Sequence, residues 1–157
     1  MRLTEYINPK CVSVDMEVKG KDEALEFLVG LLLQGGSITA AQKKEIINIL
    51  KKREALGSTG VGYGVGIPHG KCSSMDKIVL AIAVSKKGVD FDSLDGKPVH
   101  IFFLLLGPEG TPTEHLKALA RIARFSKDRN FRERIVKAET PEEILKIIKE
   151  REDKELA

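Results

Sequence analysis

The 157-residue sequence has no tryptophan, two cysteines and no long apolar run. Its longest apolar stretch, residues 99–106, is interrupted by His100 and is much shorter than the roughly 18 residues that a membrane-spanning helix needs. Two cysteines, Cys11 and Cys72, do not make a disulfide framework, and Glu5 lies where a signal peptide would keep its apolar stretch. The sequence therefore predicts a cytoplasmic protein with no direct membrane insertion.

The sequence also has no large excess of charge of one sign, because it contains 26 basic and 23 acidic residues and its net charge is +3. No basic stripe with interleaved aromatic residues occurs, so no nucleic-acid partner is expected. The cysteines lack the CxxC spacing of a zinc site, and we predict neither a metal nor a cofactor. The length fits one domain and no repeat or linker interrupts it, so residues 1–157 are predicted to form a single domain.

Apolar periodicity predicts helices, then strands, then helices along the chain. Thr39, Thr111 and Thr140 each lie three residues before a glutamine or glutamate, which is typical of capping boxes. Asp95-Gly96 predicts a turn between two buried strands. This order favours an α+β or mixed-sheet α/β fold over a doubly wound one. Helices are expected at about 22–33, 40–56, 112–125, 129–137 and from 141 onward, and strands at about 11–14, 78–84 and 99–106.

A glycine-rich run at residues 57–70 interrupts this pattern with six glycines. Such a run suits a strand or loop that another backbone or a ligand approaches closely. Two phosphate-binding motifs are excluded. Val65 and Cys72 occupy the positions where a Walker loop needs its first glycine and its hydroxyl residue, and the glycines at 60, 62 and 64 complete no G-x-G-x-x-G.

The run ends in an Ile-Pro-His-Gly segment whose histidine is His69. Proline before it and glycine after it present the imidazole from a constrained position. Imidazole is a good nucleophile near neutral pH, because much of it is uncharged there. Ser58, Thr59 and the backbone amides of the run are candidate donors to a phosphoryl group on the ring. The same residues also fit a loop histidine that does no chemistry.

The segment from Arg53 to Lys71 resembles the active-site segment of enzyme IIA domains of the bacterial phosphoenolpyruvate:sugar phosphotransferase system (PTS). It is similar to the fructose/mannitol family, PTS EIIA type 2, and its Gly-Ser-Thr-Gly and Pro-His-Gly-Lys parts look most like the nitrogen-regulatory IIA branch. The resemblance covers nearly the whole chain in length and element order. It implies a mixed β-sheet flanked by helices and a phosphotransferase with a phosphohistidine intermediate.

The resemblance also assigns roles to single residues. His69 would accept a phosphoryl group from the histidine phosphocarrier protein, HPr or a nitrogen-branch homologue. Arg53, which opens the motif, would stabilise the phosphoryl oxygens, and the alternative is a solvated arginine at a helix end. His115 would assist beside His69, and the alternative is a surface histidine near a helix N-terminus. Tyr63 departs from the family and is expected to alter the rim of the site and the choice of partner. His100 matches no catalytic residue and is expected to be structural.

Two functions follow from the resemblance. The first is a phosphoryl carrier that passes the group from His69 to a IIB partner or uses it as a nitrogen or metabolic signal. The alternative is a non-transport regulatory protein whose binding to a target is switched by phosphorylation of His69. A binding module that has lost phosphorylation is disfavoured, because Arg53, His69 and His115 occur together.

Overall fold

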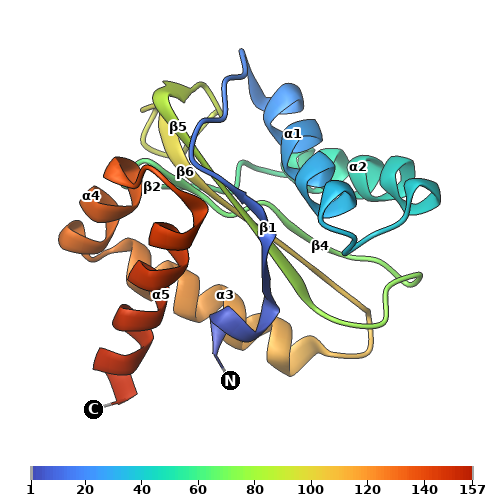
Figure 1. The fold of residues 1–157 in the computed structure, drawn as a ribbon. Coiled ribbons are helices and arrows are strands. Elements are labelled where there is room, and N and C mark those ends of the chain that lie inside the picture. Colours follow the sequence, from blue (N-terminus) through green and yellow to red (C-terminus); the bar gives the residue numbers. More distant parts are fainter. Residues whose placement is uncertain (1, 157) are drawn as a thin grey trace.

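The two apolar runs of the sequence form the centre of a six-stranded mixed sheet in the computed structural model, which describes residues 2–156. Strand β5 (Val79–Val89) pairs antiparallel with β6 (Val99–Gly107). Strand β1 (Ile7–Ser13) lies parallel to β5 at one side of the sheet (Figure 1). Parallel and antiparallel pairs therefore share one sheet, as the resemblance implied.

The glycine-rich run supplies the other side of the sheet as three short strands. Strand β3 (Val65–Gly66) pairs parallel with the first half of β6, and β2 (Gly60–Gly62) pairs antiparallel with β3 at the edge. Strand β4 (His69–Lys71) pairs parallel with the last residues of β6. The run thus folds back once between β2 and β3 and then continues along β6 as β3 and β4, and its histidine is the first residue of β4.

Helices cover both faces of the sheet (Figure 1). Helices α1 (Lys21–Gln34) and α2 (Ala40–Ala55) lie on one face. Helices α3 (Pro112–Ser126), α4 (Arg129–Lys137) and α5 (Pro141–Leu156) lie on the other, and a 3₁₀ helix, η1 (Leu3–Tyr6), precedes β1. Among residues 2–156, no helix is both long enough and apolar enough to cross a membrane.

The two central strands are apolar at nearly every position because each face contributes to a separate core. On β5, Ala81 and Ala83 point into the core under α1 and α2, whereas Leu80 and Ile82 point into the core under α3, α4 and α5. A strand that is covered on both faces loses the apolar-polar alternation of a half-exposed strand. This explains why β5 and β6 are the clearest strands in the sequence.

Three local predictions need correction. The strand expected at 11–14 spans Ile7–Ser13, because its first half is an irregular, partly exposed edge containing Pro9, where alternation gives no signal. The capping box at Thr111 is not formed, since its hydroxyl turns back to the Pro108 carbonyl at 3.4 Å. At Thr140 only half forms: its hydroxyl accepts the Glu143 N–H at 3.2 Å.

Other local predictions are confirmed. The N–H of Thr39 donates to the side chain of Gln42 at 2.9 Å, which is the reciprocal bond of a capping box. Pro112 occupies the first turn of α3, as its position after Thr111 predicted. The turn at Asp95-Gly96 closes with a hydrogen bond from the Gly96 N–H to the Ser93 carbonyl at 2.9 Å.

Candidate functional site

Residues far apart in the sequence meet in an open cleft at the end of β4. The cleft has a volume of about 720 Å³ and takes its lining from α2, β4 and α3. It brings together the three residues that the sequence singled out, Arg53, His69 and His115. Its other lining residues are Ile49, Lys52, Ala55, Leu56, Gly70, Lys71, Leu116 and Leu119.

Gly70 explains how α2 comes close enough to share this cleft. A Cβ atom at Gly70 would lie 2.9 Å from Cγ2 of Ile49, a separation that real Cβ atoms essentially never show. The absence of a side chain after His69 therefore lets α2 pack directly on the backbone of β4. Because Arg53 lies one helical turn beyond Ile49, this packing also sets the position of the guanidinium along the cleft.

The backbone fixes the protonation pattern of the His69 ring. Its Nδ1 lies 2.7 Å from the carbonyl oxygen of Ile67. A carbonyl oxygen can only accept a hydrogen bond, so Nδ1 must carry the proton. In the neutral ring Nε2 then holds the free lone pair, and it is the nitrogen that can attack an electrophile.

His115 is a second imidazole beside the first, with different electrostatics. The two ring centroids lie 6.1 Å apart and the planes are inclined at 60°. His115 is 3% exposed and its Nδ1 has no hydrogen-bond partner in the described structure. Burial, and secondarily the positive charges of His69 and Lys71, lower the pKa of His115 to about 4. His115 is therefore an uncharged ring at neutral pH.

The cleft is lined by both cationic and apolar side chains. Lys52, Arg53 and Lys71 contribute to its lining, and no carboxylate lies among the described lining residues. The Nη1 of Arg53 donates to the Gly57 carbonyl at 2.8 Å, which holds the guanidinium at the end of α2. Leu56 and Leu116 line the same cleft and are 86% and 64% exposed. Exposed leucines beside a charged cleft are typical of a surface that meets another protein.

The hydroxyls of Ser58 and Thr59 are not where the sequence suggested. The Ser58 hydroxyl donates to the Phe91 carbonyl at 2.7 Å, and the Thr59 hydroxyl donates to the Glu54 carboxylate at 2.5 Å. Neither residue lines the cleft. Their side chains instead tie the start of the glycine-rich run to Phe91 and Glu54.

Tyr63 also lies away from the cleft, contrary to the expectation that it would shape the rim. It occupies the turn between β2 and β3 with a φ of 60° and lines a separate hollow, where the Arg132 guanidinium lies 4.9 Å from its ring centroid. His100 lines this second hollow and its Nδ1 donates to the Ser85 carbonyl at 2.9 Å. That hydrogen bond agrees with the structural role expected of His100.

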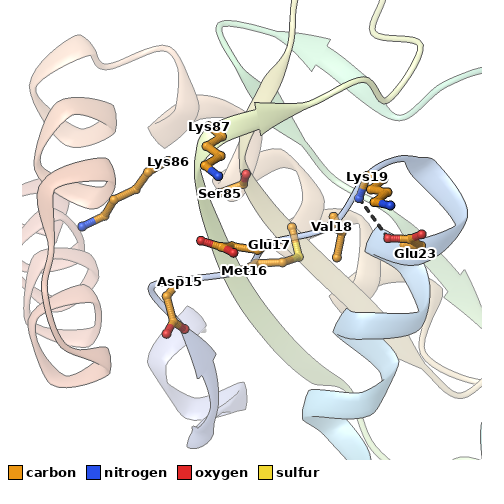
Figure 2. Close-up of a pocket in the computed structure, with 9 residues that line it drawn as sticks. All are labelled: Asp15, Met16, Glu17, Val18, Lys19, Glu23, Ser85, Lys86 and Lys87. Carbon is orange, nitrogen blue, oxygen red and sulfur yellow. Dashed lines mark hydrogen bonds between the residues drawn. The ribbon is translucent and has the colours of Figure 1, made fainter.

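A third hollow, of about 510 Å³, lies between the segment after β1 and the far end of β5 (Figure 2). Its side chains carry both charges, and Figure 2 shows Lys86 extending away from Glu23 rather than converging with it. Glu23 already accepts the Lys19 N–H at 2.9 Å. This hollow shares no residue with the cleft around His69. Among the described residues, no cluster of three or more histidine, cysteine, aspartate or glutamate side chains could hold a metal ion.

Fold and cleft together define a class of protein. The nucleophilic ring lies among cationic side chains in an open cleft, and an anionic group bound there stays within reach of a second protein seated on the leucines. Such an open site suits a domain that carries a group between proteins better than one that encloses a small substrate. The class is therefore that of group-carrier domains.

Comparison with known proteins identifies the family. The family model described as "Phosphoenolpyruvate-dependent sugar phosphotransferase system, EIIA 2" matches residues 5–151, and the chain belongs to this family of phosphotransfer proteins. The chain is 39% identical to a nitrogen regulatory protein of Bradyrhizobium diazoefficiens over 86% of each chain. It is 32% identical to the fructose-specific EIIA component of the PTS of Haloferax volcanii, over 88% of this chain and 89% of that one.

The fold agrees with this assignment. The crystal structure of the nitrogen regulatory protein IIA-Ntr from Neisseria meningitidis superposes with a TM-score of 0.85, at 34% identity, over 92% of this chain and 97% of that one. The family resemblance of the sequence and its mixed-sheet fold are thereby confirmed. The relatives carry both regulatory and sugar-specific names, and a phosphoryl-carrier or regulatory role follows for this chain.

Proposed function

We propose that this protein carries a phosphoryl group on Nε2 of His69 and receives it from a phosphorylated histidine phosphocarrier protein. The observation that carries this proposal is the hydrogen bond from His69 Nδ1 to the Ile67 carbonyl, 2.7 Å long. It leaves one nitrogen protonated and the other free, in a cleft that is open to a docking protein. Family membership supports the same chemistry, since these are phosphotransfer proteins.

The transfer itself balances without an added reactant. The Nε2 lone pair of His69 attacks the phosphorus in line, and a new N–P bond forms. The N–P bond to the donor histidine breaks and its electron pair returns to the donor ring. The Nδ1 proton stays on His69, where the Ile67 carbonyl stabilises the positive charge that the phosphorylated ring acquires. Little covalent work remains for the protein, so positioning and charge stabilisation dominate catalysis.

Arg53 and His115 act on the oxygens of the transferred group. Arg53 has five donors and uses Nη1 for the Gly57 carbonyl, so the rest of its fork is available to phosphoryl oxygens. Neutral His115 offers one N–H, a donor that costs no repulsion against the cationic ring of His69. Lys52 and Lys71 add positive charge to the cleft. Together these positive charges and donors stabilise the dianionic phosphoryl group on His69.

The exposed Leu56 and Leu116 are the proposed docking contacts. Leu56 is the C-cap residue of α2 and Leu116 lies in α3. Both line the cleft together with His69, so a partner that covers them would also cover His69. A carrier protein must bind and leave again, and small interfaces suit such encounters. A donor and an acceptor would use this one face in turn, because the same nitrogen must be reached by both.

The destination of the phosphoryl group has two candidates. Sequence similarity to a fructose-specific EIIA component favours transfer to a IIB partner. Similarity to nitrogen regulatory proteins, in sequence and in fold, favours a signal in which phosphorylation of His69 changes binding to a target protein. Incubating the phosphorylated protein with a IIB domain separates the two: rapid loss of label supports transport, and retention of label supports regulation.

The decisive test is incubation with phosphoenolpyruvate, enzyme I and the phosphocarrier protein. We expect acid-labile, base-stable phosphate on the wild type and on His100→Gln, and none on His69→Ala. His100→Gln is the matched control, since it removes an imidazole outside the cleft. Equal labelling of His69→Ala would disprove the proposal.

A further inference from the structure

Glu54 is a buried carboxylate that lies behind the cleft and outside its lining. It is 5% exposed and occupies the last turn of α2. Its carboxylate accepts the Thr59 N–H at 3.0 Å and the Thr59 hydroxyl at 2.5 Å. The ammonium of Lys21, at the start of α1, lies 3.7 Å from the same carboxylate. Three donors therefore converge on one side chain, which compensates the cost of burying its charge.

Two further hydrogen bonds of the backbone connect Thr59 to the His69 ring. The Thr59 carbonyl accepts the Ile67 N–H at 2.9 Å. The Ile67 carbonyl in turn accepts the Nδ1 proton of His69 at 2.7 Å. On the other side, the Pro68 carbonyl accepts the Leu105 N–H at 3.0 Å, which ties the same short segment to β6.

We propose that Glu54 is a positioning residue that holds His69 in its Nδ1–H tautomer through Thr59 and Ile67. The direction of the Ile67 carbonyl decides which ring nitrogen is protonated, and the anchored Ile67 N–H fixes the strand that carries this carbonyl. Glu54 fixes Thr59, whose carbonyl accepts the hydrogen bond from the Ile67 N–H. The consequence for phosphoryl transfer rests on the function proposed above, whereas the tautomer of His69 does not.

Glu54 also couples the two sides of the cleft. It follows Arg53 directly in the same helical turn, so the turn that presents the guanidinium is bonded to the strand that presents the imidazole. Movement of the end of α2 would displace both groups together. A misplacement of about 1 Å in such a constellation can slow a reaction 100-fold.

The competing explanation is that Glu54 only stabilises the fold. Glu152 provides a control for it, because it is also a buried carboxylate, 0% exposed. Glu152 accepts the backbone N–H groups of Leu3 at 2.7 Å and Thr4 at 3.3 Å and pairs with Arg121 at 3.2 Å. It lies on α5 and has no contact with the glycine-rich run. Glu152→Gln should therefore lower stability without changing His69.

The test measures the tautomer of His69 by ¹⁵N NMR of the imidazole in the unphosphorylated protein. We expect the wild type and Glu152→Gln to show His69 protonated at Nδ1, and Glu54→Gln to show a mixture of tautomers. Phosphorylation of Glu54→Gln should be at least about tenfold slower than that of the wild type. A folded Glu54→Gln protein with the wild-type tautomer and rate would overturn the proposal.

A second pair of variants keeps the test valid if Glu54→Gln does not fold. Thr59→Ser retains the hydroxyl that donates to Glu54, whereas Thr59→Val removes it at similar volume. We expect the wild-type tautomer in the serine variant and a mixture in the valine variant, and identical spectra from both would overturn the proposal. If the wild type accepts no phosphoryl group, the proposed function fails, but the tautomer measurement still decides the role of Glu54.

Discussion

The imidazoles of His69 and His115 lie 6.1 Å apart, centroid to centroid, and only the first is half-exposed in the cleft. The buried ring has a pKa lowered to about 4, and one cause of this shift is the positive charge of its neighbour. A phosphoryl group would replace that positive neighbour with a negative one. The relationship between the two rings therefore leads to a prediction about both pH and phosphorylation.

We predict that His115 titrates near pH 4 in the unphosphorylated protein and at higher pH once His69 carries a phosphoryl group. The charge of the dianionic group outweighs that of the His69 ring and favours the charged form of His115. NMR titration of the imidazole signals measures both values. His100 serves as the internal control, since its ring lies outside the cleft and its NMR signals should not change on phosphorylation. An unchanged pKa for His115 would contradict a phosphoryl group beside it.

The same shift predicts a dependence of stability on pH. His115 binds a proton at pH 6.5 in the unfolded chain but at about 4 in the folded one, so the unfolded state holds more protons between these values. The free energy of unfolding therefore falls as the pH drops from about 6.5 to about 4, by up to about 3 kcal/mol in total. Denaturant unfolding from pH 7 to pH 4 should show this slope in the wild type and a shallower one in His115→Gln.

Arg53 should matter more for transfer than for folding. Arg53→Ala removes the donors to the phosphoryl oxygens and is expected to slow phosphorylation about 100-fold. The folded protein loses the hydrogen bond to the Gly57 carbonyl, worth about 1 kcal/mol. Arg53→Lys keeps the charge without the fork and should fall between the two proteins. Rapid-quench labelling and urea unfolding measure the two effects, and an unfolded Arg53→Ala protein would make the arginine structural.

The sequence predicted most of the fold because its signals are local. Helix periodicity reflects the one buried face of each helix, and the apolar runs of β5 and β6 reflect burial on both faces of the sheet. The glycine-rich run was harder, because glycines have no side chain to alternate. Two of its three strands, β3 and β4, are defined by pairing with the distant strand β6, and β2 is defined by pairing with β3. Its conformation is set by tertiary contact and not by propensity.

The site was predicted in part for a similar reason. His69, Arg53 and His115 were predicted because their residue types match a family pattern; the cleft brings them together, and their roles stay predictions. Ser58 and Thr59 were misplaced, because a hydroxyl near a nucleophile in sequence can point elsewhere once its strand pairs. The burial of Glu54 and the exposure of Leu56 could not be read from a helix that mixes charged and apolar residues throughout.

Gly70 offers a test of the close packing between α2 and β4. Gly70→Ala places a methyl group 2.9 Å from Ile49 Cγ2 and should destabilise the protein by about 1–3 kcal/mol. Gly110→Ala is the control, because nothing lies within 4 Å of its Cβ position and the change should be within about 0.5 kcal/mol.

Trimming the partner side chain separates overpacking from other effects of the alanine at Gly70. Combining Gly70→Ala with Ile49→Ala removes the clashing methyl group, so the two changes together should cost less than the sum of the single ones. Thermal or urea unfolding of the four proteins gives the coupling energy. Strict additivity would show that the methyl at Gly70 meets no resistance from α2.

The exposed leucines of the cleft should set the affinity for the phosphocarrier protein and leave the chemical step unchanged. Leu56→Gln and Leu116→Gln replace exposed leucines with uncharged side chains of similar size, so stability should change by less than about 0.5 kcal/mol. Each should raise the carrier concentration that gives half the maximal phosphorylation rate about tenfold, since a central apolar contact of an interface is worth more than about 1 kcal/mol. The rate at saturating carrier should stay the same.

Leu94→Gln is the matched control for this experiment. Leu94 is 76% exposed, which is comparable to Leu56 and Leu116, but it lies in the β5–β6 connection and does not line the cleft. Its substitution should leave both the rate and the half-saturating carrier concentration at wild-type values. If all three variants weakened the carrier interaction equally, docking would depend on general surface hydrophobicity. If only Leu94→Gln weakened it, the carrier would approach a different face, and the path of the phosphoryl group to His69 would have to be drawn from there.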